Sequence, residues 1–163
     1  MSAEKRLHAK KSLAARSELV ALTDFSAMYQ STPHVRVQVI RRGVRAVEVK
    51  DMVRMMAAPQ DKMFKVLKLS IATVNRKANL DEALSPEDSE RVVGMANLIG
   101  QVQTMVEQSG DAAGFDAARW TARWLDAPSP ALAGVCPASY MDTMEGQMLV
   151  SNLLAIMHSG AYA

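Results

Sequence analysis

The stretch that decides the fold is SPEDSERVVGMANLIGQVQTMVEQ, residues 85–108. It begins with Ser85-Pro86-Glu87-Asp88, which places a capping hydroxyl before a proline at the first helical position and acids at the positive helix end. Apolar side chains then recur three and four residues apart, at Met95, Leu98, Ile99, Val102 and Val106. This pattern predicts a long amphipathic helix that ends near Gln108.

Upstream of this helix, the same periodicity predicts three shorter ones. Residues 46–56 carry an apolar stripe and stop before Pro59. Residues 60–69 form a second helix with lysines on its outer side, and Ser70 caps a third that runs to Lys77. Further upstream, Val35 and Val39 belong to an alternation of valines with polar residues before Gly43. That alternation predicts a short strand or extended segment.

Downstream, residues 114–126 predict a helix with Trp120 and Trp124 on one face, and a short helical turn begins at Pro137. Asp142-Thr143-Met144-Glu145 resembles a capping box for a last helix that Gly160 closes. Hydrophobic residues make up 49% of the chain and aromatic residues only 5%, a mixture that favours helices over sheets. We therefore expect an all-α fold.

Charge divides the 163 residues into two parts. Sixteen of the nineteen lysines and arginines lie in residues 1–77, beside six acids, whereas residues 78–163 hold three arginines and eleven acids. The overall net charge of +2 hides this difference, which indicates two different partners. We expect a basic N-terminal arm over residues 1–30, possibly helical, then a basic domain over residues 31–84 and an acidic domain over residues 85–163.

The composition argues against an enzyme, a metalloprotein and a membrane protein. The chain has one cysteine, Cys136, and three scattered histidines, so neither a nucleophile with its base nor a set of metal ligands is evident. There is no glycine-rich phosphate loop and no long apolar run. We expect no catalysis, no cofactor and no metal, and a reducing cytoplasm as the location.

Residues 60–77 have the order helix, tight turn, helix, and they resemble a helix-turn-helix of the Xre type. Its second helix presents side chains that suit base and phosphate contacts in a major groove: Ser70, Thr73, Asn75, Arg76 and Lys77. Phe64 and Lys68 stand where such an element often has a small residue and a turn glycine. From this half alone, DNA binding and a merely solvated basic face are both open.

A second resemblance covers the acidic half and, with its upstream joint, about residues 60–163. It is carried by Ala118, Trp124-Leu125, Pro128, Leu132, Gly134, Pro137, Thr143, Gly146, Val150, Leu153, Ile156 and Gly160, with Arg76, Leu84-Ser85 and Asp88-Ser89-Glu90-Arg91 upstream. In this order these residues resemble the toxin-binding domain of Xre/MbcA/ParS-type antitoxins. Ser129-Pro130 and Val135-Cys136 depart from the usual pattern, which leaves the toxin subclass open.

This resemblance implies an antitoxin of a type II toxin–antitoxin system whose partner is a RES-domain toxin, an enzyme that consumes NAD by hydrolysis or by ADP-ribosyl transfer. It also implies that the C-terminal end blocks the NAD cleft of the toxin. Applied to this sequence, the toxin-binding residues are His158, Ser159, Gly160, Tyr162 and Ala163. The simpler interpretation is a frayed C-terminus. We also expect a homodimer, because a two-fold symmetric protein binds an operator with two half-sites, and we expect it to repress the promoter of its own gene.

Two other functions remain open. The first is a stand-alone transcriptional regulator whose acidic half dimerises or senses a ligand. The second is a structural helical adaptor without specific DNA binding. The sequence does not determine the operator, the stoichiometry of a toxin complex, the order of residues 1–30, or whether the toxin hydrolyses NAD or modifies a protein.

Overall fold

The computed structural model describes residues 20–160, and within these residues the chain is helical. The described part holds no strand beyond an isolated bridge between Arg45 and Ala83. Its elements are α2 (Phe25–Gln30), α3 (Pro33–Arg42), α4 (Ala46–Met55), α5 (Gln60–Val66), α6 (Ile71–Asn79), α7 (Pro86–Gln108), α8 (Ala117–Asp126), the 3-10 helices η1 (Pro130–Leu132) and η2 (Pro137–Tyr140), and α9 (Met144–His158). The predicted all-α class is confirmed.

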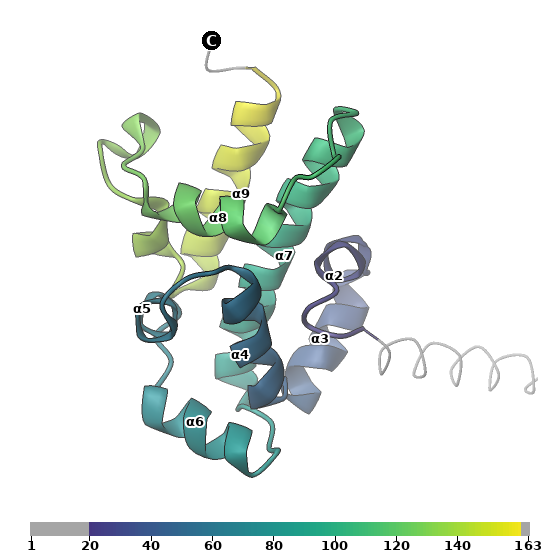
Figure 1. Cartoon of the computed structure of the whole chain (residues 1–163), viewed down its shortest axis with the longest axis vertical. Coiled ribbons are helices and arrows are strands. Elements are labelled where there is room, and N and C mark those ends of the chain that lie inside the picture. The colour runs from purple at the N-terminus through teal and green to yellow at the C-terminus, as the bar shows by residue number, and fades with distance from the viewer. Residues whose placement is uncertain (1–19, 161–163) are drawn as a thin grey trace, which may run out of the picture.

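The long helix α7 runs through the middle of the molecule, and α2, α3, α8 and α9 all pack against it (Figure 1). It begins as the sequence predicts, with the Ser85 hydroxyl accepting the amide of Asp88 at 3.1 Å. Gly100 lets α2 cross closely, since a Cβ there would overlap the backbone of Phe25. Met95 and Ile99 of α7 are fully buried. The core is therefore built around α7.

Helices α3 to α6 form the basic part of the molecule below and beside α7. The turn between α5 and α6 is closed by the Leu69 amide, which donates to the Phe64 carbonyl at 2.8 Å. Lys68 adopts φ +54° in this turn, a left-handed conformation that glycine takes more readily. Phe64, at the position where a small residue is more usual, is fully buried. The predicted helix-turn-helix forms although Phe64 and Lys68 differ from the residues that are usual at these two positions.

The short strand or extended segment predicted around Val35 is wrong, because these residues form α3. Thr32 caps the helix by accepting the amide of Val35 at 3.3 Å, and Pro33 is the first helical residue. Val35 and Val39, four residues apart, are buried, whereas Val37 between them is exposed. The alternation that suggested a strand is one buried helical face with an exposed valine beside it.

The C-terminal part packs α8, η1, η2 and α9 above the basic part (Figure 1). Helix α9 begins one residue later than a capping box at Asp142 would place it: the cap is Thr143, whose hydroxyl accepts the amide of Gly146 at 3.0 Å. Helix α8 starts at Ala117, behind the cap Asp116. Residues 20–160 contain no helix whose length and apolar character would allow it to cross a membrane.

Most of the predicted N-terminal arm, residues 1–19, lies outside the described residues. Its remaining part contains α2, whose Phe25 and Met28 are buried against α7. Leu22 is also buried, and its amide donates to a carboxylate oxygen of Glu48 in α4 at 3.2 Å. Residues 20–30 therefore belong to the folded body.

Candidate toxin-binding and DNA-binding surfaces

Helix α9 carries more apolar surface than the fold buries. Val150, Leu153 and Leu154 face the core, whereas Leu149 and Ile156 are exposed on the other side. The exposed side borders a groove that the η1 segment and Tyr140 close, with Leu132 as an apolar wall. A helix that is apolar all round is covered on all sides in its working state. This face of α9 is the candidate protein-binding surface.

The loop that forms the far wall of this groove is set by residues of the family pattern. Gly134 adopts φ +84°, and its amide donates to the Ser129 carbonyl at 2.8 Å. Gly146 lets the start of α9 approach the Tyr140 carbonyl so closely that a Cβ would overlap it. The Cys136 thiol donates to the Asp126 carbonyl at 3.2 Å and so ties the loop to the end of α8.

The C-terminal end of α9 leads away from the body. His158, Ser159 and Gly160 are exposed, and Gly160 adopts φ +72°. Tyr162 and Ala163, the other predicted toxin-binding residues, lie outside the described residues. His158 borders a recess together with Trp120, which stacks on Trp124 with ring centroids 5.8 Å apart. The described part of the tail is accessible to a partner.

Four of the predicted DNA-binding residues lie on α6 and the fifth, Ser70, is its N-cap, and some of them hold the helix in place. The Ser70 hydroxyl caps α6 by accepting the Thr73 amide at 3.3 Å. The Asn75 Oδ1 accepts hydrogen bonds from Lys50 Nζ and Gln60 Nε2, both at 3.2 Å, which joins α6 to α4 and α5. Thr73 is half-buried. These residues position the helix, and the amide NH2 of Asn75 keeps its donors.

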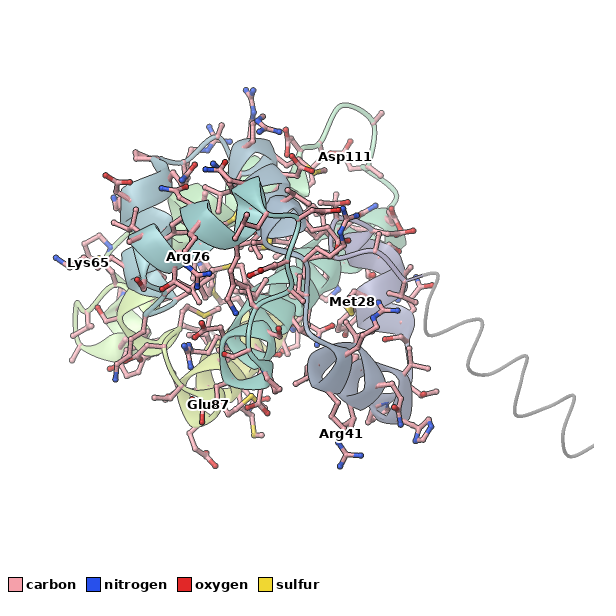
Figure 2. All side chains as sticks on the ribbon, turned by 90° about the horizontal axis from the view of Figure 1, so that it is seen from below. Met28, Arg41, Lys65, Arg76, Glu87 and Asp111 are labelled. Atoms are coloured by element: carbon pink, nitrogen blue, oxygen red, sulfur yellow. The ribbon has the colours of Figure 1, made fainter. Side chains whose placement is uncertain are left out.

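The two cations of the predicted set also have partners within the chain. Arg76 is exposed and lies 3.7 Å from Glu82, a loose ion pair of the kind that contributes little to stability. Lys77 Nζ donates to the Ala83 carbonyl at 3.1 Å. Figure 2 shows Arg76 within the outline of the molecule and Lys65, an exposed cation of α5, at its left edge. The structure places the five residues on α6 and its N-cap, where Ser70 and Arg76 are exposed and the other three are half-buried.

The described residues contain no group of three or more histidines, cysteines and acids placed to hold a metal ion. The pKa of the Arg45 guanidinium is raised, first by its hydrogen bond to Asp81 and then by the charge of that carboxylate. This ion pair joins the start of α4 to the residues after α6. It braces the helix-turn-helix and is not part of a reactive site.

The sequence interpretation missed the exposed face of α9 as a binding surface. The last helix holds more apolar residues than a single buried stripe can use. The signal was present, because Met148, Leu149 and Ile156 lie outside the stripe that Val150 begins. An apolar count too large for one face indicates a partner.

A basic helix-turn-helix joined to a helical domain with an uncovered apolar face defines a two-part regulatory protein with a protein partner. Residues 35–97 match the model of the antitoxin Xre-like helix-turn-helix domain, and residues 112–160 match that of the antitoxin Xre/MbcA/ParS C-terminal toxin-binding domain. The chain is also similar to the Prs ADP-ribosylating antitoxin of Sphingobium sp. (strain YBL2), with 48% identity over 139 residues that cover 85% of this chain and 87% of that protein.

The chain belongs to the Xre/MbcA/ParS antitoxin family. It is an antitoxin of a toxin–antitoxin system, and its partner is a cognate toxin. The predicted family and the predicted helix-turn-helix are thereby confirmed.

Proposed function

We propose that this antitoxin neutralises a NAD-consuming toxin of the RES class by placing its C-terminal segment in the active site of the toxin. It acts by binding and performs no catalytic step of its own. The single observation that carries the proposal is the apolar face of α9, which leads directly to an accessible end at Gly160. A surface that holds the toxin and a segment that blocks its active site would thus lie on one helix.

The exposed face of α9 supplies the affinity in this proposal. Leu149 and Ile156 lie about two helical turns from one another and border the groove next to Leu132. A few side chains that fill well-packed pockets carry most of the binding energy of a protein interface. The toxin would cover this face and so remove its apolar side chains from water.

The tail supplies the block. His158 and Ser159 offer hydrogen-bonding groups, and Gly160 allows the chain to turn at little steric cost. In the sequence, Tyr162 adds a ring that can stack and Ala163 brings a carboxylate if it is the last residue. These are the chemical groups that a cleft for a dinucleotide accepts.

The class of toxin is proposed on two grounds. The resemblance to the toxin-binding domain implies a RES-domain partner, and the similar Sphingobium protein carries the name Prs ADP-ribosylating antitoxin. ADP-ribosyl transfer consumes NAD, so both grounds point to an NAD cleft as the place that the tail occupies.

We also propose that the basic half binds the operator of its own gene, as a homodimer in the cytoplasm, and represses transcription. The second helix of the helix-turn-helix carries Thr73, Asn75, Arg76 and Lys77, and Ser70 caps its start. Binding to the promoter that is at least about 1,000-fold tighter than to random duplex, measured across a salt series, would support specific repression. Equal affinities for the two would leave the antitoxin without this second activity.

Deletion of residues 160–163 tests the block. The toxin is co-purified with the intact antitoxin and with the deletion variant, and both NAD consumption and the dissociation constant of the complex are measured. We expect the variant to bind the toxin and to allow NAD consumption to resume. Full inhibition by the deletion variant would show that the tail does not occlude the active site.

A further inference from the structure

An isoleucine lies at the start of α6 without a core to cover. Ile71 is the first residue of the helix, and its side chain is 39% exposed. The residue that α6 buries in the core is Val74, and Ile71 lies outside the buried cluster. Ala72, the next residue, is also exposed. A single exposed isoleucine is ordinary on a protein surface, so its meaning depends on where it lies.

Ile71 lies at the end of α6 that meets the bases in a helix-turn-helix. In this class of domain the first residues of the second helix contact the base edges in the major groove. Figure 1 shows α6 at the lower end of the molecule and α9 in its upper part. A duplex bound along α6 would therefore lie at the opposite end of the molecule from the C-terminal end of α9.

The start of α6 is fixed by hydrogen bonds from two directions. The Ser70 hydroxyl accepts the Thr73 amide at 3.3 Å and caps the helix. From α7, Arg91 donates to the carbonyls of Leu67 and Lys68 at 2.7 and 3.3 Å. A β-branched side chain in a helix has one strongly preferred rotamer. Both the backbone and the side chain of Ile71 are thus positioned before DNA binds.

The charge around this end of α6 suits a nucleic acid. The first turn of α6 contains no acid, whereas α5 before it has Asp61 and α7 after it has Glu87 and Asp88. Lys65 and Lys68, which precede α6, are exposed. The positive end of the helix dipole adds to these two cations. Phosphates beside the groove are therefore attracted to the turn that carries Ile71.

The polar side chains further along α6 are partly used inside the protein. Asn75 Oδ1 accepts hydrogen bonds from Lys50 and Gln60, which occupy both of its lone pairs. A bidentate contact with adenine needs this oxygen as an acceptor, so Asn75 keeps only its donors for a base. Lys77 Nζ donates to the Ala83 carbonyl. This arrangement leaves the first turn of α6 as the place where base identity can be recognised.

Thymine presents an apolar group in the major groove. Its C5 methyl group lies there, whereas guanine, adenine and cytosine present hydrogen-bond donors and acceptors. An isoleucine placed against a donor or an acceptor would remove that group from water without a new partner. Placed against the methyl group, it removes apolar surface from water. The side chain of Ile71 is therefore suited to thymine and disfavours the other bases.

We propose that Ile71 recognises a thymine of the operator by packing on its C5 methyl group. The small side chain of Ala72 leaves room for the base edge beside this contact. Lys65 and Lys68 hold phosphates without regard to sequence, and Ile71 selects the base. This inference rests on the proposed operator binding and names both the base and the residue that selects it.

Duplexes that lack the thymine methyl groups test the contact. Footprinting of the full chain on the promoter of its own gene first locates the protected segment. Fluorescence anisotropy then compares this duplex with a copy in which deoxyuridine replaces every thymidine of the segment. We expect the unmodified chain to bind the deoxyuridine duplex at least about fourfold more weakly, because the burial of one methyl group is lost.

Ile71→Ala separates this contact from any effect of deoxyuridine on the duplex itself. The variant should bind the promoter at least about fourfold more weakly and should bind the thymidine and deoxyuridine duplexes equally. Ile71→Val keeps a branched apolar side chain and should keep part of the difference. Leu80→Ala is the matched control, because Leu80 is a 59% exposed apolar residue at the other end of α6, and it should keep the full difference.

Two further measurements show that the variants are folded. Their thermal unfolding, followed by circular dichroism, and their affinity for a random duplex should equal those of the unmodified chain, because the phosphate contacts are unchanged.

The inference is wrong if Ile71→Ala, folded by these criteria, still loses affinity on the deoxyuridine duplex as the unmodified chain does. Specific promoter binding by the unmodified chain that is equal for thymidine and deoxyuridine would overturn this inference alone. Promoter affinity no greater than the affinity for random duplex would overturn the proposed repressor and this inference together.

Discussion

Removing the side chain of Arg91 should loosen the turn of the helix-turn-helix from a position on α7. The Nε of Arg91 donates to the Leu67 carbonyl at 2.7 Å, and one terminal nitrogen donates to the Lys68 carbonyl at 3.3 Å. The same guanidinium pairs with Asp88 one turn earlier on α7. Arg91→Ala removes all three interactions, and the apolar neighbours are not changed.

The magnitude follows from the burial of these groups. The side chains of Arg91 and Asp88 are only 19% and 25% exposed, so water replaces the lost hydrogen bonds incompletely. A hydrogen bond to a charged group contributes about 1.5–3 kcal/mol, but the three share one side chain and their energies are not additive. We expect the free energy of unfolding to fall by about 3 kcal/mol, and the Tm of a chain of this size to fall by roughly 6–12 °C.

Urea unfolding measures the loss, and hydrogen exchange locates it. The Leu69 amide, which donates to the Phe64 carbonyl inside the turn, should lose protection more than the amides in the middle of α7. Arg91→Lys is the matched control, because it keeps the charge and one donor and should recover part of the loss. A loss below about 0.5 kcal/mol, or one spread evenly over the molecule, would refute the reasoning that Arg91 fastens the turn.

Three further predictions concern the turn, the central helix and the exposed face of α9. Lys68→Gly should raise the free energy of unfolding by about 0.5 kcal/mol in urea unfolding, because relief of the left-handed conformation outweighs the added chain entropy; a loss would contradict this. Ser85→Ala should lower it by about 1 kcal/mol through loss of the α7 cap, whereas Ser85→Asp, which can still cap, should not; an unchanged value for Ser85→Ala would refute the role. Leu149→Asp should leave thermal unfolding unchanged within about 0.5 kcal/mol and weaken toxin binding in calorimetry at least about 100-fold; normal affinity would remove this face from the interface.

The sequence predicts the fold well where capping and periodicity agree. Ser85, Ser70 and Gly160 end or begin helices as predicted, because each acts through its own neighbours. Around Val35 the two signals conflict: β-branched residues alternate, while Thr32-Pro33 is a helix start. Both valines are buried in α3, and Val39 lies in the same buried cluster as Val92 and Val93 of α7, which are more than 50 residues further along the chain. A sequence window around Val35 therefore does not contain the contact that decides between strand and helix.

The site is predictable in part for the same reason. Residue types on α6 could be read from the sequence, but the partners that Asn75 finds on α4 and α5 could not. A groove between α3, α7 and α9 joins segments from both halves of the chain, so no window of the sequence contains it. The sequence does show how many apolar residues α9 has. A single buried stripe accounts for only some of them, and the others form the exposed face.

The charge difference between the two halves is partly used inside the molecule. Arg45 pairs with Asp81, Lys62 with Asp126 and Arg76 with Glu82, so each of these pairs joins the basic residues 1–77 to the acidic remainder. All three pairs are about half exposed, and pairs of this kind contribute at most about 1 kcal/mol each. A phosphate that approaches Arg76 can therefore replace Glu82 at little cost. The three pairs offset only three of the sixteen cations in residues 1–77, so in the proposed DNA complex most of these cations remain for phosphates, and the affinity should fall as the salt concentration rises.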